Sequence, residues 1–213
     1  MFPFINKTWN PLGGECLHHC SYCWAKKLIK NYNMKKYTGP PVLIEKEMKQ
    51  TFKETDFVFV CDMTDLFGKW VPTELIKEIL DVIRKNPAKF LLLTKNPIRY
   101  RYFSIPENCA CGATIETDMS LDDSLAPPVG LRLAVMESLK QYFTPKHTMI
   151  SIEPIKHFSR DFAQIIISGK PDFVAVGYDN YNNNLTEPSF NNTLRLIKAL
   201  EDAHIKVYKK TLR

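Results

Sequence analysis

Three cysteines on one short stretch constrain this chain more than any other feature of its sequence. Cys16, Cys20 and Cys23 follow the pattern C-x3-C-x2-C within the segment TWNPLGGECLHHCSYCWA (8–25), and Tyr22 stands immediately before the last of them. Thiolates are the soft ligands that iron–sulfur clusters and zinc prefer, and three on one loop can ligate three corners of a cluster. The spacing therefore predicts a metal-binding loop.

A zinc site is the alternative for this loop. Structural zinc normally takes four protein ligands in paired spacings. His18 and His19 would have to complete such a set, but both lie inside the loop, where joint ligation is awkward. A 4Fe–4S cluster held by three cysteines instead keeps one iron open for another ligand. The pattern favours the cluster.

Length and composition fit one soluble domain over residues 1–213, of 24.7 kDa. The first residues, MFPFINKTWN, lack the basic and apolar regions of a secretory signal, and no apolar stretch approaches the roughly 20 residues that span a bilayer. Six cysteines in such a chain indicate a reducing compartment and metal binding rather than a disulfide framework. We therefore expect a cytoplasmic protein without a membrane partner.

The net charge of +6 comes largely from residues 26–53, which hold eight lysines against two glutamates. A basic segment beside an active site attracts phosphate backbones, so a nucleic-acid substrate is one interpretation. The other is a solvated lysine-rich face, which the lack of interleaved base-stacking aromatic residues favours.

Apolar runs alternate with helical patterns along the rest of the chain, which indicates a parallel α/β architecture. We expect seven strands, at residues 4–10, 56–61, 90–94, 110–116, 147–152, 173–177 and 205–209, and helices at 22–30, 45–53, 72–86, 98–103, 131–143, 158–168 and 190–203. Ser189 is the expected N-cap of the last helix. A closed eight-stranded barrel takes about 250 residues, so the chain predicts an open, partial β/α barrel of six or seven strands. A doubly wound open sheet is the alternative.

Nearly every predicted strand ends on a carboxylate, a lysine or a hydroxyl. In parallel α/β folds ligands bind at the carboxyl ends of the strands. This rim therefore predicts the active site, with catalytic candidates Lys95, Glu153, Lys209 and Cys61. Cys61 is a possible hydrogen-atom donor. Cys109 and Cys111 precede the fourth strand, at the opposite rim, and are expected to be ordinary thiols rather than ligands of an auxiliary cluster.

The cysteine motif resembles that of the radical S-adenosylmethionine (radical SAM) superfamily. Further blocks resemble those of short phage- and archaeal-type radical SAM proteins of unassigned function, distantly similar to spore photoproduct lyase. They are TWNPLGGEC (8–16), CSYCWAKKL (20–28), CDMTDLFG (61–68), LLTKNP (92–97), GATIETD (112–118) and SIEP (151–154).

The resemblance implies a 4Fe–4S cluster on the three cysteines and S-adenosylmethionine bound beside it. The reduced cluster would cleave this cofactor to a 5′-deoxyadenosyl radical that abstracts hydrogen from an unidentified substrate, in a lyase or transferase reaction. The residues that it implies as cofactor contacts are Tyr22, Asp62, Thr64, Asp65, Glu116 and Gly177. Asp62-Met63-Thr64-Asp65 stands where the superfamily has Gly-Gly-Glu.

The implied partners are an electron donor of flavodoxin or ferredoxin type and a protein or large substrate that covers the rim. The rival function is a non-catalytic zinc or iron–sulfur module of a nucleic-acid-associated complex.

Overall fold

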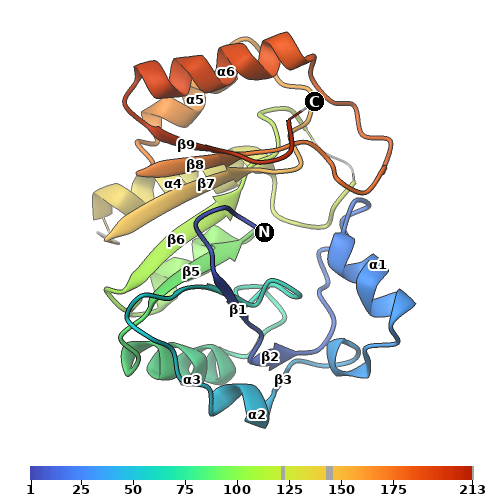
Figure 1. Ribbon diagram of the computed structural model, residues 1–213, viewed down its shortest axis with the longest axis vertical. Helices are drawn as coiled ribbons and strands as arrows, with labels where there is room; N and C mark the ends of the chain where they lie inside the picture. Colours follow the sequence, from blue (N-terminus) through green and yellow to red (C-terminus); the bar gives the residue numbers. More distant parts are fainter. Residues whose placement is uncertain (121–122, 143–145, 213) are drawn as a thin grey trace.

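The computed structural model describes residues 1–120, 123–142 and 146–212. In these ranges seven parallel strands form one sheet in the order β1-β4-β5-β6-β7-β8-β9, which curls into a half-barrel (Figure 1). The strands are β1 (Lys7–Trp9), β4 (Phe57–Val60), β5 (Lys89–Thr94), β6 (Cys109–Thr114), β7 (His147–Ile152), β8 (Phe173–Val176) and β9 (Lys206–Lys209). The predicted partial barrel is confirmed, and the doubly wound sheet is not found because each strand is added beside the preceding one.

Helices cover the outer face of the sheet. They are α3 (Thr73–Arg84), α4 (Val129–Tyr142), α5 (Phe162–Ser168) and α6 (Phe190–Asp202), with the 3-10 helix η2 (Pro97–Tyr102) after β5. The helix expected at 131–143 is α4, which is observed as far as Tyr142. Residue 143 lies outside the described residues. The predicted apolar stripe of α3 is buried at Ile76, Ile79, Leu80 and Ile83, and Ser189 caps α6 by accepting a hydrogen bond from the Asn192 amide.

The N-terminal residues fill the inner face. Phe2 and Ile5 pack against one inward-pointing side chain from each central strand, namely Leu91, Ala110, Met149 and Ala175. The two alanines leave room for the incoming rings. Phe4 lies 5.4 Å from Phe57 of β4 and 4.5 Å from Tyr208 of β9, as measured between ring centroids. One aromatic side chain thus bridges the two sides of the open barrel, close to the amino ends of the strands.

Short elements differ most from expectation. The predicted first strand, 4–10, is regular only over β1, because residues 1–6 turn into the barrel. The helix expected at 45–53 ends early, as α2 (Glu45–Met48). A two-stranded ribbon of β2 (Leu12–Gly13) and β3 (Val42–Leu43) was not predicted, since two-residue strands have no periodicity. Between them lie α1 (Trp24–Asn31) and η1 (Lys35–Tyr37).

No helix in the described ranges combines the length and apolarity that crossing a bilayer requires.

Candidate functional site

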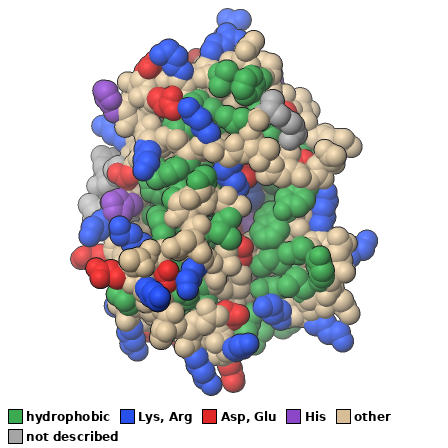
Figure 2. Space-filling model, in the orientation of Figure 1, with side chains coloured by type: hydrophobic (Ala, Val, Ile, Leu, Met, Phe, Trp, Pro, Cys, Tyr) green, Lys and Arg blue, Asp and Glu red, His purple; other side chains and the backbone are tan. Residues whose placement is uncertain are grey.

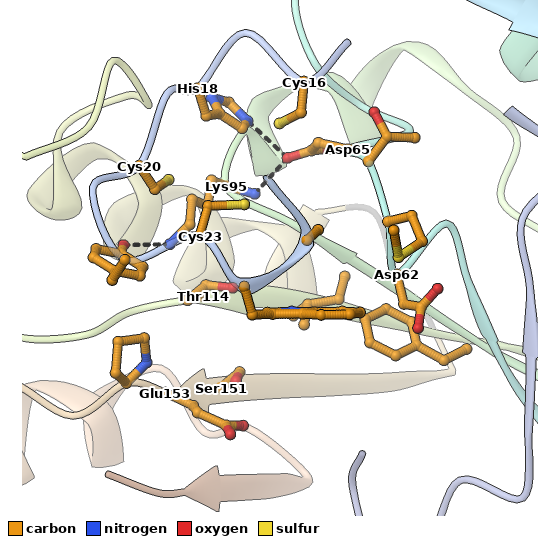
Figure 3. A pocket seen from close by; sticks show the side chains of 18 of the residues that line it. Cys16, His18, Cys20, Cys23, Asp62, Asp65, Lys95, Thr114, Ser151 and Glu153 are labelled. Carbon is orange, nitrogen blue, oxygen red and sulfur yellow. Dashed lines mark hydrogen bonds and ion pairs between the residues drawn. The ribbon is translucent and has the colours of Figure 1, made fainter. Parts of the chain in front are cut away.

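A cavity of about 480 Å³ opens at the carboxyl ends of the strands, within the roughly 300–1,000 Å³ typical of ligand pockets. It is visible as the hollow at the centre of Figure 2. The cysteine loop and the start of α1 form one wall, and the ends of β4 to β8 form the floor and the other wall. Predicted residues that line it are Cys16, Cys20, Tyr22, Cys23, Cys61, Asp62, Thr64, Asp65, Lys95 and Glu153 (Figure 3).

The backbone enters the cysteine loop at Gly14, whose φ of +94° favours glycine. A Cβ there would lie 2.6 Å from the Pro40 carbonyl oxygen, too close for any side chain. The loop closes with a hydrogen bond of 3.2 Å from the Cys23 amide to the Cys20 carbonyl. Cys23 then caps α1, since its sulfur accepts from the Lys26 amide at 3.4 Å. The last cysteine is thus both the end of the loop and the start of a helix.

A second segment, residues 123–125, holds the loop from the other side. The Ser21 amide donates to the Asp123 carbonyl at 2.9 Å, and the Leu125 amide donates to the His18 carbonyl at 2.7 Å. The hydroxyl of Ser124 lies 3.3 Å from the sulfur of Cys20. Segments about 100 residues apart in the sequence therefore set the shape of the loop.

The three loop thiols lie on the same wall of the cavity. All three are half-buried and line the cavity. Burial, the Asp65 carboxylate and the other two loop cysteines together raise the pKa of Cys16 to about 12. In the described ranges no group of three or more His, Cys, Asp or Glu side chains is arranged around a single metal ion.

This arrangement fits a cluster better than zinc. Each cysteine of a 4Fe–4S cluster ligates a different iron, so the sulfurs need not converge on one point. His18, the nearest candidate for a fourth zinc ligand, is buried, and its Nε2 lies 2.7 Å from Asp65. Three soft, cavity-facing donors match a cluster that keeps one iron open toward the cavity.

Asp65 lies at the centre of a buried hydrogen-bond network. Its carboxylate accepts from the Thr94 hydroxyl at 2.7 Å, the Lys95 amide at 2.9 Å and the Phe67 amide at 2.9 Å, besides its contact with His18. Burial alone would raise the pKa of Asp65, but these donors outweigh it and lower the pKa. Asp65 lines the cavity and also ties the cysteine loop to the ends of β4 and β5.

Glu116 is the second buried anchor, with none of its surface exposed. Its carboxylate contacts the Tyr22 hydroxyl and the Lys95 ammonium through one oxygen, and the Arg132 guanidinium at 2.9 Å through the other. Burial would raise the pKa of Glu116, but Lys95 and Arg132 lower it to about 2. Glu116 is one of the predicted cofactor contacts. It does not line the cavity, and its carboxylate contacts the hydroxyl of Tyr22, which does.

Tyr22 is thereby fixed in place. Its hydroxyl accepts from Lys95 at 2.9 Å, and the ammonium groups of Lys95 and Lys156 lie 5.2 and 4.8 Å from its ring centroid. Lys156 itself pairs with Asp123, the first residue of the segment that holds the loop. The aromatic residue of the cysteine motif is a rigid bridge between the loop and the sheet.

Cys61, Asp62 and Thr64, which follow β4, also line the cavity. Asp62 accepts from the Asn10 side-chain amide at 2.6 Å, and burial raises its pKa. Thr64 lines the cavity next to it. Cys61 is buried with φ of +57°, lines the same cavity, and burial raises the pKa of its thiol.

One predicted catalytic residue, Lys209, does not line the cavity, whereas its neighbour Lys210 does. Lys209 points to the outer surface, where it pairs with Glu201 of α6 at 2.9 Å. Side chains alternate along a strand, so the next residue, Lys210, points inward and pairs with Glu153 at the cavity. Gly177 lies behind this pair, and a Cβ there would come within 3.0 Å of Lys210. Alternation along β9 is the sequence signal that would have found Lys210.

Sequence reasoning also missed His18 as a buried partner of Asp65, and Arg132 and Lys156 as partners of the network around Glu116 and Tyr22. Their pairing depends on contacts between distant segments, so no local sequence pattern predicts it.

The two cysteines of β6 lie outside the cavity that the cysteine loop lines. Cys109 and Cys111 are buried in β6 and line a second cavity, of about 430 Å³, with Tyr100 and Leu139.

Solved structures with a similar fold share little sequence with this chain. A spore photoproduct lyase variant with bound AdoMet and dinucleoside spore photoproduct has a TM-score of 0.65 at 10% identity, over 100% of this chain and 79% of its own. SuiB of Streptococcus suis bound to its precursor peptide SuiA has a TM-score of 0.61 at 10% identity, over 97% of this chain and 49% of its own. SuiB bound to S-adenosylmethionine has a TM-score of 0.57 at 12% identity, over 98% of this chain and 48% of its own.

This chain therefore shares its half-barrel fold with spore photoproduct lyase and SuiB. No curated protein shows significant sequence similarity to this chain. One family model matches residues 2–155, a span that includes the cysteine loop and the strand ends up to Pro154. The chain therefore belongs to the family described as "Protein of unknown function (DUF5131)".

Proposed function

We propose that this chain is a radical SAM enzyme in which Cys16, Cys20 and Cys23 hold a 4Fe–4S cluster and the cavity beside them binds S-adenosylmethionine. The observation that carries this proposal is the position of the three thiols: they line one wall of a large cavity at the carboxyl rim. A reduced cluster held by these three cysteines would supply the one electron needed for reductive cleavage of S-adenosylmethionine, and the cleaved cofactor would supply the hydrogen abstraction from a substrate. The fold of two enzymes crystallised with this cofactor supports the proposal.

The side chains divide the work of holding the cofactor. Asp62 and Thr64 offer a carboxylate and a hydroxyl to the cofactor's ammonium group from the end of β4. Lys210 and Glu153 form an ion pair that lines the cavity and is available to polar groups of the cofactor or substrate. Lys95 and Glu116 contact Tyr22 and act as positioning residues.

Cys61 is the proposed hydrogen-atom donor of the cavity. Its raised pKa keeps the sulfur as a thiol at neutral pH, the state that still carries a hydrogen atom.

Cofactor cleavage tests the proposal directly. Protein reconstituted anaerobically with iron and sulfide, then given dithionite and S-adenosylmethionine, is expected to form 5′-deoxyadenosine and methionine. A colourless protein that retains one zinc and leaves the cofactor intact would refute the enzyme and favour a structural metal module.

The substrate needs its own test. The two neighbours hold different molecules, a dinucleoside photoproduct and a peptide, so the shared fold does not choose between them. Binding to single- and double-stranded oligonucleotides that weakens steeply with added salt would support a nucleic-acid substrate. Binding that is absent, or insensitive to salt, would point to a peptide or a small molecule.

A further inference from the structure

The eleven residues that follow the cysteine loop carry a one-sided charge. Residues 26–36 contain five lysines and no acidic residue. All five lysines are exposed, and in the described ranges none forms an ion pair with a carboxylate. Lys27 donates instead to the Asn183 side chain and the Tyr181 carbonyl. We call residues 26–36 the basic segment.

The basic segment lies against the loop but outside the cavity. None of its lysines lines the cavity, whose lysines in the described ranges are Lys95 and Lys210. Both of these are paired, with Glu116 and Glu153. None of the five lysines of the basic segment therefore lines the proposed substrate space, although Lys27 contacts the carbonyl of Tyr181, which does.

The segment is also physically close to the loop. Cys23 is the N-cap of α1, and a helix rises 1.5 Å per residue, so Lys30 lies about 10 Å along the axis from that cysteine. The helix is packed down through Ala25, which joins Tyr37 and Met63 in a small buried cluster. A molecule seated on α1 and η1 would thus lie next to the cluster cysteines and be held in a fixed relation to them.

The surface combines charge with apolar contact area. Tyr32 is 72% exposed, and Trp24, Leu28 and Ile29 are only half-buried. In Figure 2, green side chains gather on the right-hand side where α1 lies in Figure 1, with blue side chains around them. Exposed tyrosine and tryptophan within a polar rim are typical of protein–protein interfaces.

We propose that the basic segment is the docking surface for an acidic one-electron carrier protein of flavodoxin or ferredoxin type. This rests on the proposed function, because the carrier's task is to pass one electron to the oxidised cluster, the carrier being oxidised by one electron as the cluster is reduced by one. Charge complementarity selects an acidic partner, and the position outside the cavity selects one that delivers an electron rather than a substrate. The two lysines that line the cavity are already paired with Glu116 and Glu153, whereas the five lysines of the basic segment beside it form no ion pair among the residues that the structure describes.

A charge-reversal variant tests this surface. The variant carries Lys30→Glu, Lys35→Glu and Lys36→Glu. Its matched control carries the same charge change on exposed lysines of α3 and its surroundings, at Lys77→Glu, Lys85→Glu and Lys89→Glu. Each reconstituted protein is assayed for 5′-deoxyadenosine formation with reduced flavodoxin and, separately, with dithionite. Binding of oxidised flavodoxin is measured independently of catalysis.

At low ionic strength the variant should lose at least about 10-fold in the flavodoxin-driven rate and in flavodoxin affinity, and added salt should shrink the difference from wild type. The control should lose less than about 2-fold. The dithionite-driven rate should be unchanged in both, which separates docking from the proposed chemistry: if dithionite gives no product even in wild type, the chemistry has failed and the binding measurement still decides the docking.

Equal flavodoxin affinity and rate in variant and wild type would overturn the proposal. So would an equal loss in the control, which would indicate a non-specific charge effect. Loss of oligonucleotide binding in the variant with flavodoxin binding intact would overturn it in favour of a nucleic-acid surface.

Discussion

The two ends of the half-barrel are built from opposite chemistry. At the amino end, Phe2, Phe4 and Ile5 fill the interior with apolar contacts. At the carboxyl end, the same interior opens into a cavity lined by thiols, carboxylates and lysines. Phe2 marks the boundary, since it belongs to the apolar cluster and also lines the cavity, with the Lys210 ammonium 4.8 Å from its ring centroid.

The difference shows how an open barrel obtains both a core and a site. Seven curled strands do not enclose enough side chains to fill their own interior, so the first residues of the chain supply the rest. We call residues 2–5 the N-terminal plug. Beyond this plug, the carboxyl ends of the strands carry polar side chains, many of which line the cavity. Some of these groups are fully paired anchors, such as Asp65 and Glu116, and others, such as Asp62, face the cavity.

The largest expected effect is at the carboxyl end and concerns the metal. Cys16→Ala, Cys20→Ala and Cys23→Ala should each abolish stoichiometric iron and the visible absorption of the reconstituted protein, because each removes one cluster ligand. Cys61→Ala is the matched control, since it removes a thiol that lines the same cavity. It should keep the iron. Iron retained in all three loop variants would contradict the proposed ligand set.

The next effect tests the anchor beneath the loop. Glu116→Gln leaves Lys95 and Arg132 without their buried counter-charge, which should lower the free energy of unfolding by about 3–5 kcal/mol. Urea denaturation measures it. Glu201→Gln, which breaks the exposed pair with Lys209, should cost no more than about 1 kcal/mol. Similar losses in the two variants would mean that the buried network does not hold the loop.

The plug provides the contrasting change. Phe4→Ala removes a ring that bridges β4 and β9, and should lower the free energy of unfolding by about 2–4 kcal/mol. Because the cysteines are at the other end, the iron content after reconstitution should stay at the wild-type value. If Phe4→Ala kept its stability but lost iron, the two ends of the half-barrel would not have separate roles.

Acid should weaken the carboxyl end selectively. The pKa of Glu116 is lowered to about 2 in the folded protein from an ordinary 4.5, so folding is favoured above the unfolded value. The stabilisation is complete above about pH 5 and is lost as the pH falls from about 4.5 toward 2. Urea titrations at pH 7, 4 and 3 should therefore show a steeper loss in wild type than in Glu116→Gln. Parallel loss in both would exclude Glu116 as the source.

The smallest effect separates two adjacent lysines. Lys210→Ala leaves Glu153 unpaired beside the cavity and should lower the free energy of unfolding by about 1–2 kcal/mol. Lys209→Ala removes a pair whose two side chains are nearly half exposed, and should change it by less than about 0.5 kcal/mol. Thermal unfolding compares them. The reverse order would contradict the inward orientation of Lys210.

The sequence by itself determined the order of the strands, the open barrel and the position of the cysteine loop after the first strand. These follow from local signals: buried strands are continuous apolar runs, and the ligand spacing lies within eight residues, so each can be read without knowing the tertiary contacts. Most candidate residues, from Cys16 to Glu153, were placed at strand ends by the same logic, and the structure brings them to one cavity.

The tertiary structure alone decided what each polar group does there. Glu116 and Asp62 look alike in the sequence, yet one is sealed beneath Tyr22 by Lys95 and Arg132 while the other faces the cavity. The plug of residues 2–5 and the segment 123–125 are likewise invisible to periodicity, because both act through contacts between distant parts of the chain. Burial and pairing set the charge and freedom of a side chain, and both are properties of neighbours in space rather than neighbours in sequence.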